Sequence, residues 1–143
     1  MTSLDAAEAR RRLAAARVAR LATADADGRP HVVPFVFAVD GDTVWSAVDA
    51  KPKTTTALRR LANVAANPAV AVLADHYDDA DWTALWWVRA DGRGRLLEAG
   101  APEARHGVEL LVARYEQYRE RPPSGPVLAI EVVRWVGWSA ASG

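Results

Sequence analysis

Short apolar segments separated by turn signals are the feature that most constrains the fold of this chain. Residues 18–24 and residues 30–39 are rich in Val, Ala and Phe, and the turn Asp25-Ala26-Asp27-Gly28 separates them. Asp40-Gly41 is a strong hairpin signal, and residues 43–48 follow it as a return strand. The sequence therefore predicts three antiparallel strands before residue 49.

The rest of the chain alternates strands with helices. Helices are predicted over residues 4–17, capped by Thr2 or Ser3, over 55–66, ended by Asn67-Pro68, and over 103–119, with Pro102 in the first turn. Further strands are predicted over residues 69–74, 82–90, 95–98 and 127–138, with Gly92 and Gly94 suited to a bulge. Six or seven mostly antiparallel strands favour a small closed barrel, mainly β with a few helices, over a doubly wound sheet. We expect a single domain over residues 1–143.

Composition removes several classes of function. The 18 acidic residues balance the 18 basic ones, so no broad positive field favours nucleic acid. Without cysteine, the chain has no disulfide, thiolate metal site or thiol nucleophile. No apolar run approaches the roughly 20 residues that cross a membrane, and residues 1–12 read as a mixed-charge helix with no apolar signal core. We expect a cytoplasmic protein with neither nucleic acid nor membrane as a partner.

Lysine is confined to one short segment. Only Lys51 and Lys53 among the 18 basic side chains are lysines, and they lie in Lys51-Pro52-Lys53-Thr54, directly before a predicted helix. Backbone N–H groups at a helix start, next to two ammonium groups, are suited to a phosphate or carboxylate. The segment therefore indicates an anion site, and a solvated loop is the alternative.

Tryptophan and proline mark a second candidate region. The chain has six tryptophans, and Trp86 and Trp87 are adjacent in a predicted strand, so they must face opposite sides. The outward indole is explained by a partner subunit or by a flat ligand. Pro34 removes a ladder donor, which places its strand at an edge or opens it locally. Such a strand can meet the polar edge of a planar heterocycle, or the proline can serve the fold alone.

Other candidate chemistry is weak. Asp75, His76, Asp78, Asp79 and Asp81 bring metal-type ligands together, but their spacing matches no loop motif, and we expect no metal. No Gly-x-Ser-x-Gly segment is present, and Gly92-Arg93-Gly94 lacks the third glycine of a dinucleotide site. No spacing selects a catalytic residue; Tyr77, His31 or water could supply a proton.

Several of these segments together resemble a known family. Arg20-Leu21-Ala22-Thr23, Asp27-Gly28-Arg29-Pro30-His31-Val32-Val33-Pro34 and Lys51-x-Lys53 resemble the flavin/deazaflavin oxidoreductases of the split β-barrel class, related to pyridoxamine 5′-phosphate oxidase. Asp75-His76-Tyr77 and Asp81-Trp82-x-x-Leu85-Trp86-Trp87-Val88-Arg89 resemble its actinobacterial branch of coenzyme F-420-dependent enzymes.

The resemblance implies an FMN-binding-like split barrel that forms a homodimer with cofactor sites at the interface. It places the cofactor ring against Val32, Val33, Pro34 and Phe35, and its phosphate at Lys51, Pro52, Lys53 and Thr54. Arg59 or Arg60 is a second anchor, and the strand with Trp86 and Trp87 completes the pocket from the other subunit.

Three functions follow as expectations from this resemblance. The first is hydride transfer from reduced coenzyme F-420 to a small organic acceptor. The second keeps the enzyme class and uses FMN, because an FMN phosphate suits the same loop. The third is a carrier that binds a flavin-like or tetrapyrrole ligand without a redox step. The acceptor side is expected to be lined by apolar groups such as Phe35, Phe37 and the tryptophans.

Overall fold

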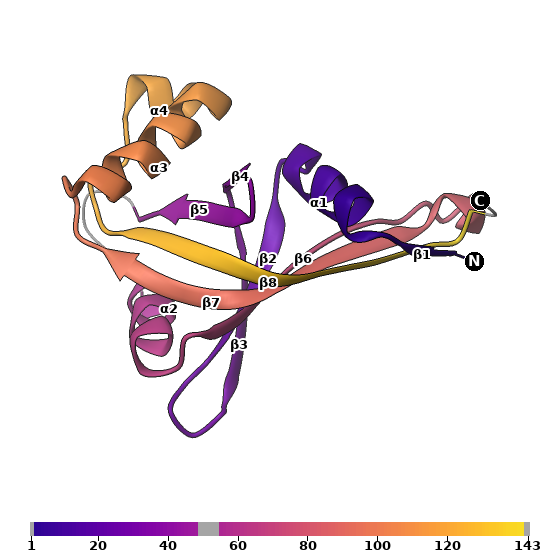
Figure 1. The fold of residues 1–143 in the computed structure, drawn as a ribbon, viewed down its shortest axis with the longest axis horizontal. Coiled ribbons are helices and arrows are strands. Elements are labelled where there is room, and N and C mark those ends of the chain that lie inside the picture. Colours follow the sequence, from indigo (N-terminus) through magenta and orange to yellow (C-terminus); the bar gives the residue numbers. More distant parts are fainter. Residues whose placement is uncertain (1, 49–54, 142–143) are drawn as a thin grey trace.

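One curved antiparallel sheet forms the body of the molecule (Figure 1). The computed structural model of the chain describes residues 2–48 and 55–141. Within them the strand order is β3-β2-β6-β7-β8-β5-β4, and β1 pairs with β8. The strands are β1 (Thr2–Leu4), β2 (Ala19–Ala24), β3 (Pro30–Phe35), β4 (Ala38–Asp40), β5 (Thr43–Ala47), β6 (Ala69–His76), β7 (Trp86–Leu97) and β8 (Val127–Ser139). The helices are α1 (Ala6–Ala15), α2 (Thr55–Ala66), the 3₁₀ turn η1 (Trp82–Ala84), α3 (Pro102–Arg114) and α4 (Glu116–Glu120).

The two ends of the sheet are joined by a very short connection. Strands β3 and β4 lie at opposite ends of the strand order, yet only Val36 and Phe37 separate them in the sequence. The sheet must therefore curl until its ends meet, which confirms the predicted split barrel. Since β3 pairs with β2 alone, Pro34 lies in an edge strand, as its missing N–H predicts.

The connection at Val36 and Phe37 corrects the predicted continuous strand over residues 30–39. The Ser46 hydroxyl donates to the Val36 carbonyl at 3.0 Å. The Phe37 N–H donates to the Tyr115 hydroxyl at 3.2 Å, and that hydroxyl donates to the Phe37 carbonyl at 2.9 Å. Side chains thus satisfy backbone groups that a neighbouring strand would otherwise pair.

Alternate residues of the strands fill the barrel, and helix α1 packs against this core. Leu13 of α1 is fully buried with strand residues such as Leu21, Val72 and Ile130. The Asp5 side chain caps α1 by accepting the Glu8 N–H at 2.8 Å. The predicted helix start at Leu4 is wrong, because Leu4 instead pairs with Gly137 in the β1–β8 ladder.

Strand β7 and helix α3 also differ from their predicted bounds. Strand β7 runs without interruption from Trp86 to Leu97, since its glycines lie within the ladder and the register shift falls at Asp91 and Gly92. Residues 82–84 form η1 instead of starting this strand. The predicted helix over 103–119 divides at Tyr115, whose hydroxyl is bonded to the Phe37 backbone. Helix α2 has its predicted bounds.

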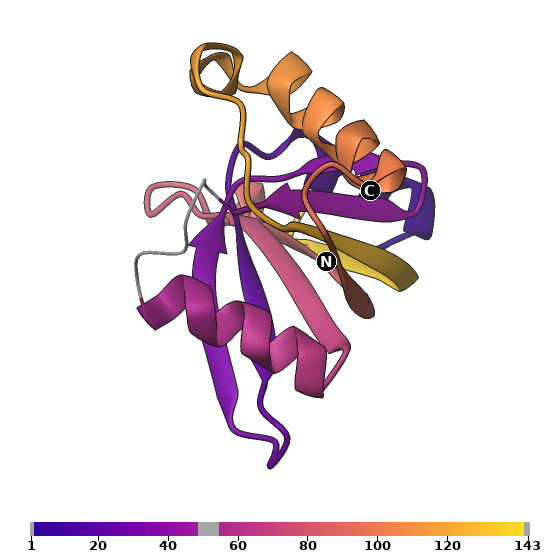
Figure 2. The same ribbon diagram turned by 90° about the vertical axis from the view of Figure 1, so that its left-hand side faces the viewer.

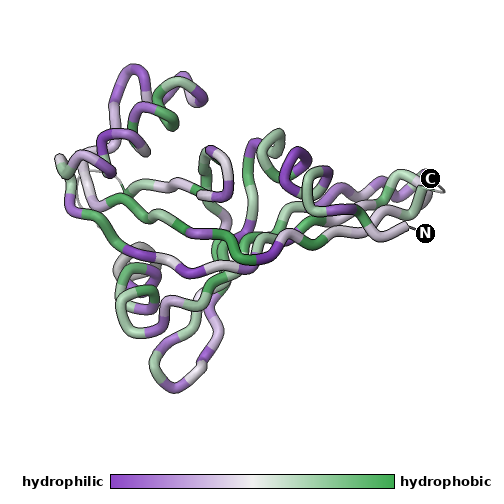
Figure 3. The backbone as a smooth tube through the Cα atoms, viewed as in Figure 1, coloured by the Kyte–Doolittle hydropathy of each residue, from purple (hydrophilic) through white to green (hydrophobic). Residues whose placement is uncertain are grey.

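Helices α2 and α3 lie on opposite sides of the long β7–β8 pair in both ribbon views (Figures 1 and 2). Helix α3 approaches β5 closely, because a Cβ added at Gly107 would lie 2.5 Å from the Trp45 ring. Hydrophobic residues run through the strands, whereas hydrophilic residues recur along α1 and α3 (Figure 3). None of the described helices is long and apolar enough to span a bilayer.

Candidate functional site: a hollow on the outer sheet face

The outer face of strands β2, β3, β6 and β7 carries an ordered set of side chains. Because side chains alternate along a strand, buried Leu21 and Val72 leave Arg20, Ala22, Ala71 and Leu73 facing outward. The registers align these residues into rows that cross the strands. One row is Pro34, Arg20, Leu73, Arg89 and Val136; the next is Val32, Ala22, Ala71, Asp91 and Arg134; a third is Asp75, Trp87 and Trp138.

A hollow of about 520 Å³ lies on this face. Ala22 and Ala71 are neighbours in the second of these rows, and their short side chains leave space beside the longer residues around them. Four strands spaced by about 4.8 Å make a face about 14 Å wide, sufficient for a flat ring system. The hollow is lined by Arg20, Ala22, Val32, Ala71, Leu73, Asp75, Trp87 and Arg89.

Three residues of β7 form a fixed polar stripe along one edge of the hollow. Arg89 donates to both carboxylate oxygens of Asp91, from Nε to Oδ1 at 2.6 Å and from Nη2 to Oδ2 at 3.2 Å. This hydrogen bonding raises the pKa of the Arg89 guanidinium. The guanidinium carbon also lies 5.7 Å from the centre of the Trp87 ring, within cation–π range. The Arg89 guanidinium therefore holds the Trp87 indole plane in place, and Asp91 neutralises the charge of that guanidinium.

Arg20 and Asp75 are the remaining charged residues of the hollow. No described residue forms an ion pair or a hydrogen bond with either side chain. Arg20 shares its row with Leu73, and Asp75 lies two residues beyond Leu73 on β6. Residues in such a diagonal relation are separated by about 7–8 Å. Among the described residues, the hollow thus has an unpaired cation on β2 and an unpaired anion on β6, one row apart.

The structure distributes the residues predicted for the ring between the two faces of the sheet. Val32 and Trp87 line the hollow, and Pro34 belongs to the same outward row as Arg20. Phe35 is 6% exposed in the core, and Trp86 packs against that core. The opposite orientation of the two tryptophans is as predicted. Val33, Phe35 and Trp86 do not line the hollow, because strand alternation turns them inward.

Phe37 requires a correction of a related expectation. It was expected on the acceptor side with Phe35, but both rings are buried and stack with centroids 5.3 Å apart. They contribute to the barrel core and do not reach the outer face. The apolar side chains that do face the hollow are Val32, Leu73 and Trp87.

The residues predicted to hold the phosphate either precede α2 in the sequence or belong to its first two turns. Lys51, Pro52, Lys53 and Thr54 lie outside the described residues. Arg59 is exposed, whereas Arg60 is half-buried, and this burial lowers the pKa of the Arg60 guanidinium. No carboxylate within the described ranges pairs with Arg60. Neither arginine lines the outer hollow.

Candidate acid–base and metal residues are dispersed. Tyr77 is exposed and its hydroxyl donates to Asp79 at 2.8 Å. His31 lies in β3 and its Nδ1 is buried without a hydrogen-bond partner. The described residues contain no group of three or more metal-type side chains placed to hold an ion. Neither Tyr77 nor His31 lines the hollow.

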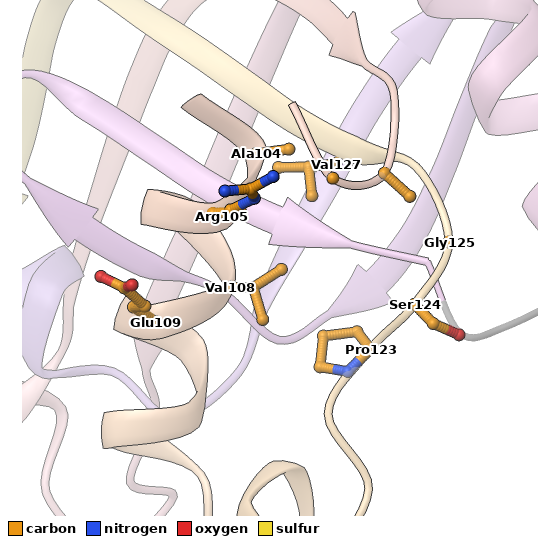
Figure 4. A pocket seen from close by; sticks show the side chains of 10 residues that line it. Ala104, Arg105, Val108, Glu109, Pro123, Ser124, Gly125 and Val127 are labelled. Atoms are coloured by element: carbon orange, nitrogen blue, oxygen red, sulfur yellow. The ribbon is translucent and has the colours of Figure 1, made fainter. Parts of the chain in front are cut away.

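A second hollow of the same volume, about 520 Å³, lies between α3 and the segment before β8. Val108 of α3 lies opposite Pro123, and the Glu109 carboxylate points away from Pro123 (Figure 4). Its walls include the small residues Gly100, Ala104 and Gly125. None of the predicted site residues lines this hollow.

Sequence reasoning missed the contribution of Arg20, Leu73, Asp75 and Arg89 to the outer hollow. Alternation along residues 18–24 and 69–74 would have placed Arg20, Ala22, Ala71 and Leu73 on one face of their strands. Joining these residues into one face requires the pairing of β2 with β6, two strands that lie far apart in the chain. The alternation within each strand was visible in the sequence, but it does not reveal that β2 pairs with β6.

Comparison with known proteins identifies the fold. The chain is similar to an FAD-binding protein from Mesorhizobium loti, with 23% identity, 95% of each chain covered and a TM-score of 0.71. An FAD-binding protein from Mycobacterium smegmatis is 21% identical, with 96% of this chain and 97% of that chain covered and a TM-score of 0.63. The heme storage protein HutZ from Vibrio cholerae is 16% identical, with 93% and 90% covered and a TM-score of 0.69.

No curated protein matches the chain. The family model described as pyridoxamine 5′-phosphate oxidase matches residues 6–139, which is nearly the whole sequence and includes every strand of the outer hollow. The chain therefore belongs to the pyridoxamine 5′-phosphate oxidase family.

Proposed function

We propose that this chain is an oxidoreductase that binds a flavin-type cofactor in the outer hollow and reduces a small organic molecule. Coenzyme F-420 is the cofactor that the resemblance of Asp75-His76-Tyr77 and residues 81–89 implies, and FMN is the alternative. The observation that carries the proposal is the position of Val32 and Trp87. Val32 was predicted from the segment that contains Pro34, and Trp87 from the pair of adjacent tryptophans. Both residues line one hollow on the outer face.

The hollow fits a flat ring. Its floor is the alanine pair Ala22 and Ala71, Val32 lies on the β3 side, and Leu73 lies beside the Trp87–Arg89 stripe on the β7 side. Apolar walls with a few polar groups are typical of cofactor sites. The FAD-binding proteins of similar fold support a ligand of this class.

We assign the cofactor phosphate to Lys51, Lys53 and Thr54, with Arg60 as a further cation. The described flanks of this segment are anchored, because Val48 exchanges backbone hydrogen bonds with Pro126 and Gly125 at 2.9 and 3.0 Å. Helix α2 begins at Thr55, and the first N–H groups of a helix attract anions. Arg60, half-buried without a carboxylate partner within the described ranges, adds positive charge to the same helix.

We further propose that two copies associate through this outer face. Val32 is 61% exposed and Val133 is 72% exposed, and both are apolar. Half-buried Val136 and Trp138 extend the same face across β8. Exposed apolar residues grouped on one sheet face are typical of an interface. A second copy would cover the hollow and exclude water from a ring bound there.

The bound cofactor supplies hydride transfer. The residues of the chain supply position: Trp87, fixed by Arg89, defines one wall, and Val32 and Leu73 restrict the ring to a single plane. No side chain of the hollow is assigned as a proton donor. Water or a group of the second copy is expected to provide any proton that the acceptor needs.

A heme carrier is the rival suggested by the similarity to HutZ. The residues that line the outer hollow include no His, Cys, Met or Tyr, which are the side chains that ligate heme iron. This composition favours a flavin-type ring over a tetrapyrrole.

Titration of the purified protein with FMN and with coenzyme F-420, read by quenching of the tryptophan fluorescence, tests the proposal. We expect saturable binding of one cofactor. In the Lys51→Ala/Lys53→Ala variant we expect the free energy of cofactor binding to weaken by about 2–5 kcal/mol, since two charge-assisted contacts are removed. Turnover of quinones, enones or nitro compounds by the loaded protein separates an enzyme from a carrier. Absence of binding to both cofactors would reject the proposal.

A further inference from the structure

Arg20 is the one cation of the outer hollow that has no partner among the described residues. Arg89 is neutralised by Asp91 through two hydrogen bonds, whereas the Arg20 guanidinium makes none. It projects from the second residue of β2, beside the alanine floor, and lies between Pro34 and Leu73 in one row. Any ring that occupies the hollow will therefore touch it.

Covering Arg20 with a neutral apolar ring would be costly. A guanidinium has five N–H donors, and removing it from water without an acceptor costs far more than an ordinary polar contact returns. A negatively charged or strongly accepting ring edge removes this cost and adds a charge-assisted hydrogen bond. The composition of the hollow thus favours an anionic ring edge at Arg20.

Asp75 fixes the direction of that edge. Its unpaired carboxylate lies one row away from Arg20, in the end row of the hollow, next to Trp87 in the neighbouring strand. Negative charge on the ligand is repelled from Asp75 and attracted to Arg20. An N–H group of the ligand can instead donate a hydrogen bond to the Asp75 carboxylate. The two residues give the hollow a polarity that a flat ring can follow in one orientation only.

We propose that Arg20 is a specificity-determining residue that selects a flat ring carrying negative charge and orients its charged edge, with Asp75 facing the opposite edge. The inference deepens the proposed function, on which it rests for the identity of the ring. The charge has two possible sources: the cofactor ring in its reduced state, or an acidic substrate stacked on that ring.

The first arm of the test uses FMN and the variants Arg20→Gln and Arg20→Lys. Oxidised FMN has a neutral ring and reduced FMN has an anionic one, so Arg20→Gln is expected to weaken binding of the reduced form about tenfold more than that of the oxidised form. For a two-electron couple this lowers the midpoint potential of bound FMN by about 30 mV. Arg20→Lys keeps the charge and is expected to retain most of the wild-type preference for reduced over oxidised FMN.

The second arm compares 2-naphthoate with 2-naphthamide, which share a ring and differ in charge. Wild-type protein is expected to bind the naphthoate more tightly, with the preference lost in Arg20→Gln and increased in Asp75→Asn. Arg93→Gln is the matched control, because Arg93 lies outside the hollow on the same face of β7 and its substitution removes the same charge.

Each outcome decides the inference. A lower potential assigns the charge to the cofactor ring, and a lost naphthoate preference assigns it to the substrate. If Arg20→Gln matches Arg93→Gln in both arms, the inference is overturned. Should the protein bind neither FMN nor coenzyme F-420, the proposed function fails, and the naphthoate arm on the free protein still decides the role of Arg20.

Discussion

The outer hollow and the hollow beside α3 have the same volume, about 520 Å³ each, and differ in how their walls are built. The outer hollow is made by four hydrogen-bonded strands, so the positions of Val32, Trp87 and Arg20 are fixed by the sheet register. The other is made by one helix face and the irregular segment around Pro123. A rigid wall with an unpaired charge can select a ligand, whereas equal volume alone selects none.

The largest expected effect comes from filling each hollow in turn. Ala71→Phe places a ring on the floor of the outer hollow, and we expect cofactor affinity to fall by about 100-fold or more, which is about 2.7 kcal/mol. Val108→Phe fills the hollow beside α3 and should leave affinity unchanged. Fluorescence titration of both variants measures this difference. Equal losses in the two variants would abolish the distinction between the hollows.

A charge on the outer face should separate the two copies. Val133 is the additional residue at the β8 register shift and is 72% exposed. Val133→Glu would bury an unpaired carboxylate in the proposed interface, and we expect the dimer dissociation constant to rise about tenfold or more. Ala26→Glu adds the same charge in the β2–β3 turn as a control. Sedimentation showing a monomer for the wild-type protein would contradict the proposed dimer.

Tyr115 links the end of α3 to the barrel and should affect stability without affecting the outer hollow. Its hydroxyl accepts from the Phe37 N–H, and its single hydrogen is shared between the Phe37 carbonyl at 2.9 Å and the Arg17 carbonyl at 3.0 Å. Tyr115→Phe is expected to lower the free energy of unfolding by about 1–3 kcal/mol, because these groups lose their partner. Urea unfolding measures the change, with Tyr77→Phe as the exposed control. A large change in cofactor affinity of folded Tyr115→Phe would show that the two regions are coupled.

The smallest expected effect concerns acid stability. Hydrogen bonds from Arg11 and Arg12 lower the pKa of the exposed Glu8 carboxyl from 4.5 to about 2. Because the folded-state pKa is depressed, the ion pairs contribute fully above pH 4.5 and their contribution is lost as the pH falls toward 2. Glu8→Gln should therefore flatten the dependence of Tm on pH in this window, with Glu109→Gln as the control. Solvent screening keeps the effect small, and an unchanged slope would contradict it.

Local features of the sequence predicted much of the fold. Helix α2 ends where Asn67-Pro68 ends it, and Trp86 and Trp87 face opposite sides because strand geometry requires it. The failures have a common physical cause in long-range contacts. Leu4 joins a strand because Gly137 pairs with it, and the strand over residues 30–39 breaks because Tyr115 bonds Phe37.

The candidate site was predictable only in part for the same reason. Val32, Pro34 and Trp87 carry their own signals as apolar, proline and aromatic strand residues. Arg20 reads locally as an ordinary solvated side chain, and it becomes informative only when β2 lies between β3 and β6. Ala22 and Ala71 form the floor of the hollow through the pairing of their strands, which neither segment encodes alone.

A crystal structure of the protein loaded with FMN or coenzyme F-420 is the most direct test of where the ring binds. We predict ring density over Ala22 and Ala71, between Val32 and Trp87, with an acceptor edge at Arg20. Ring density between α3 and Pro123, with the outer hollow filled by solvent, would contradict this assignment.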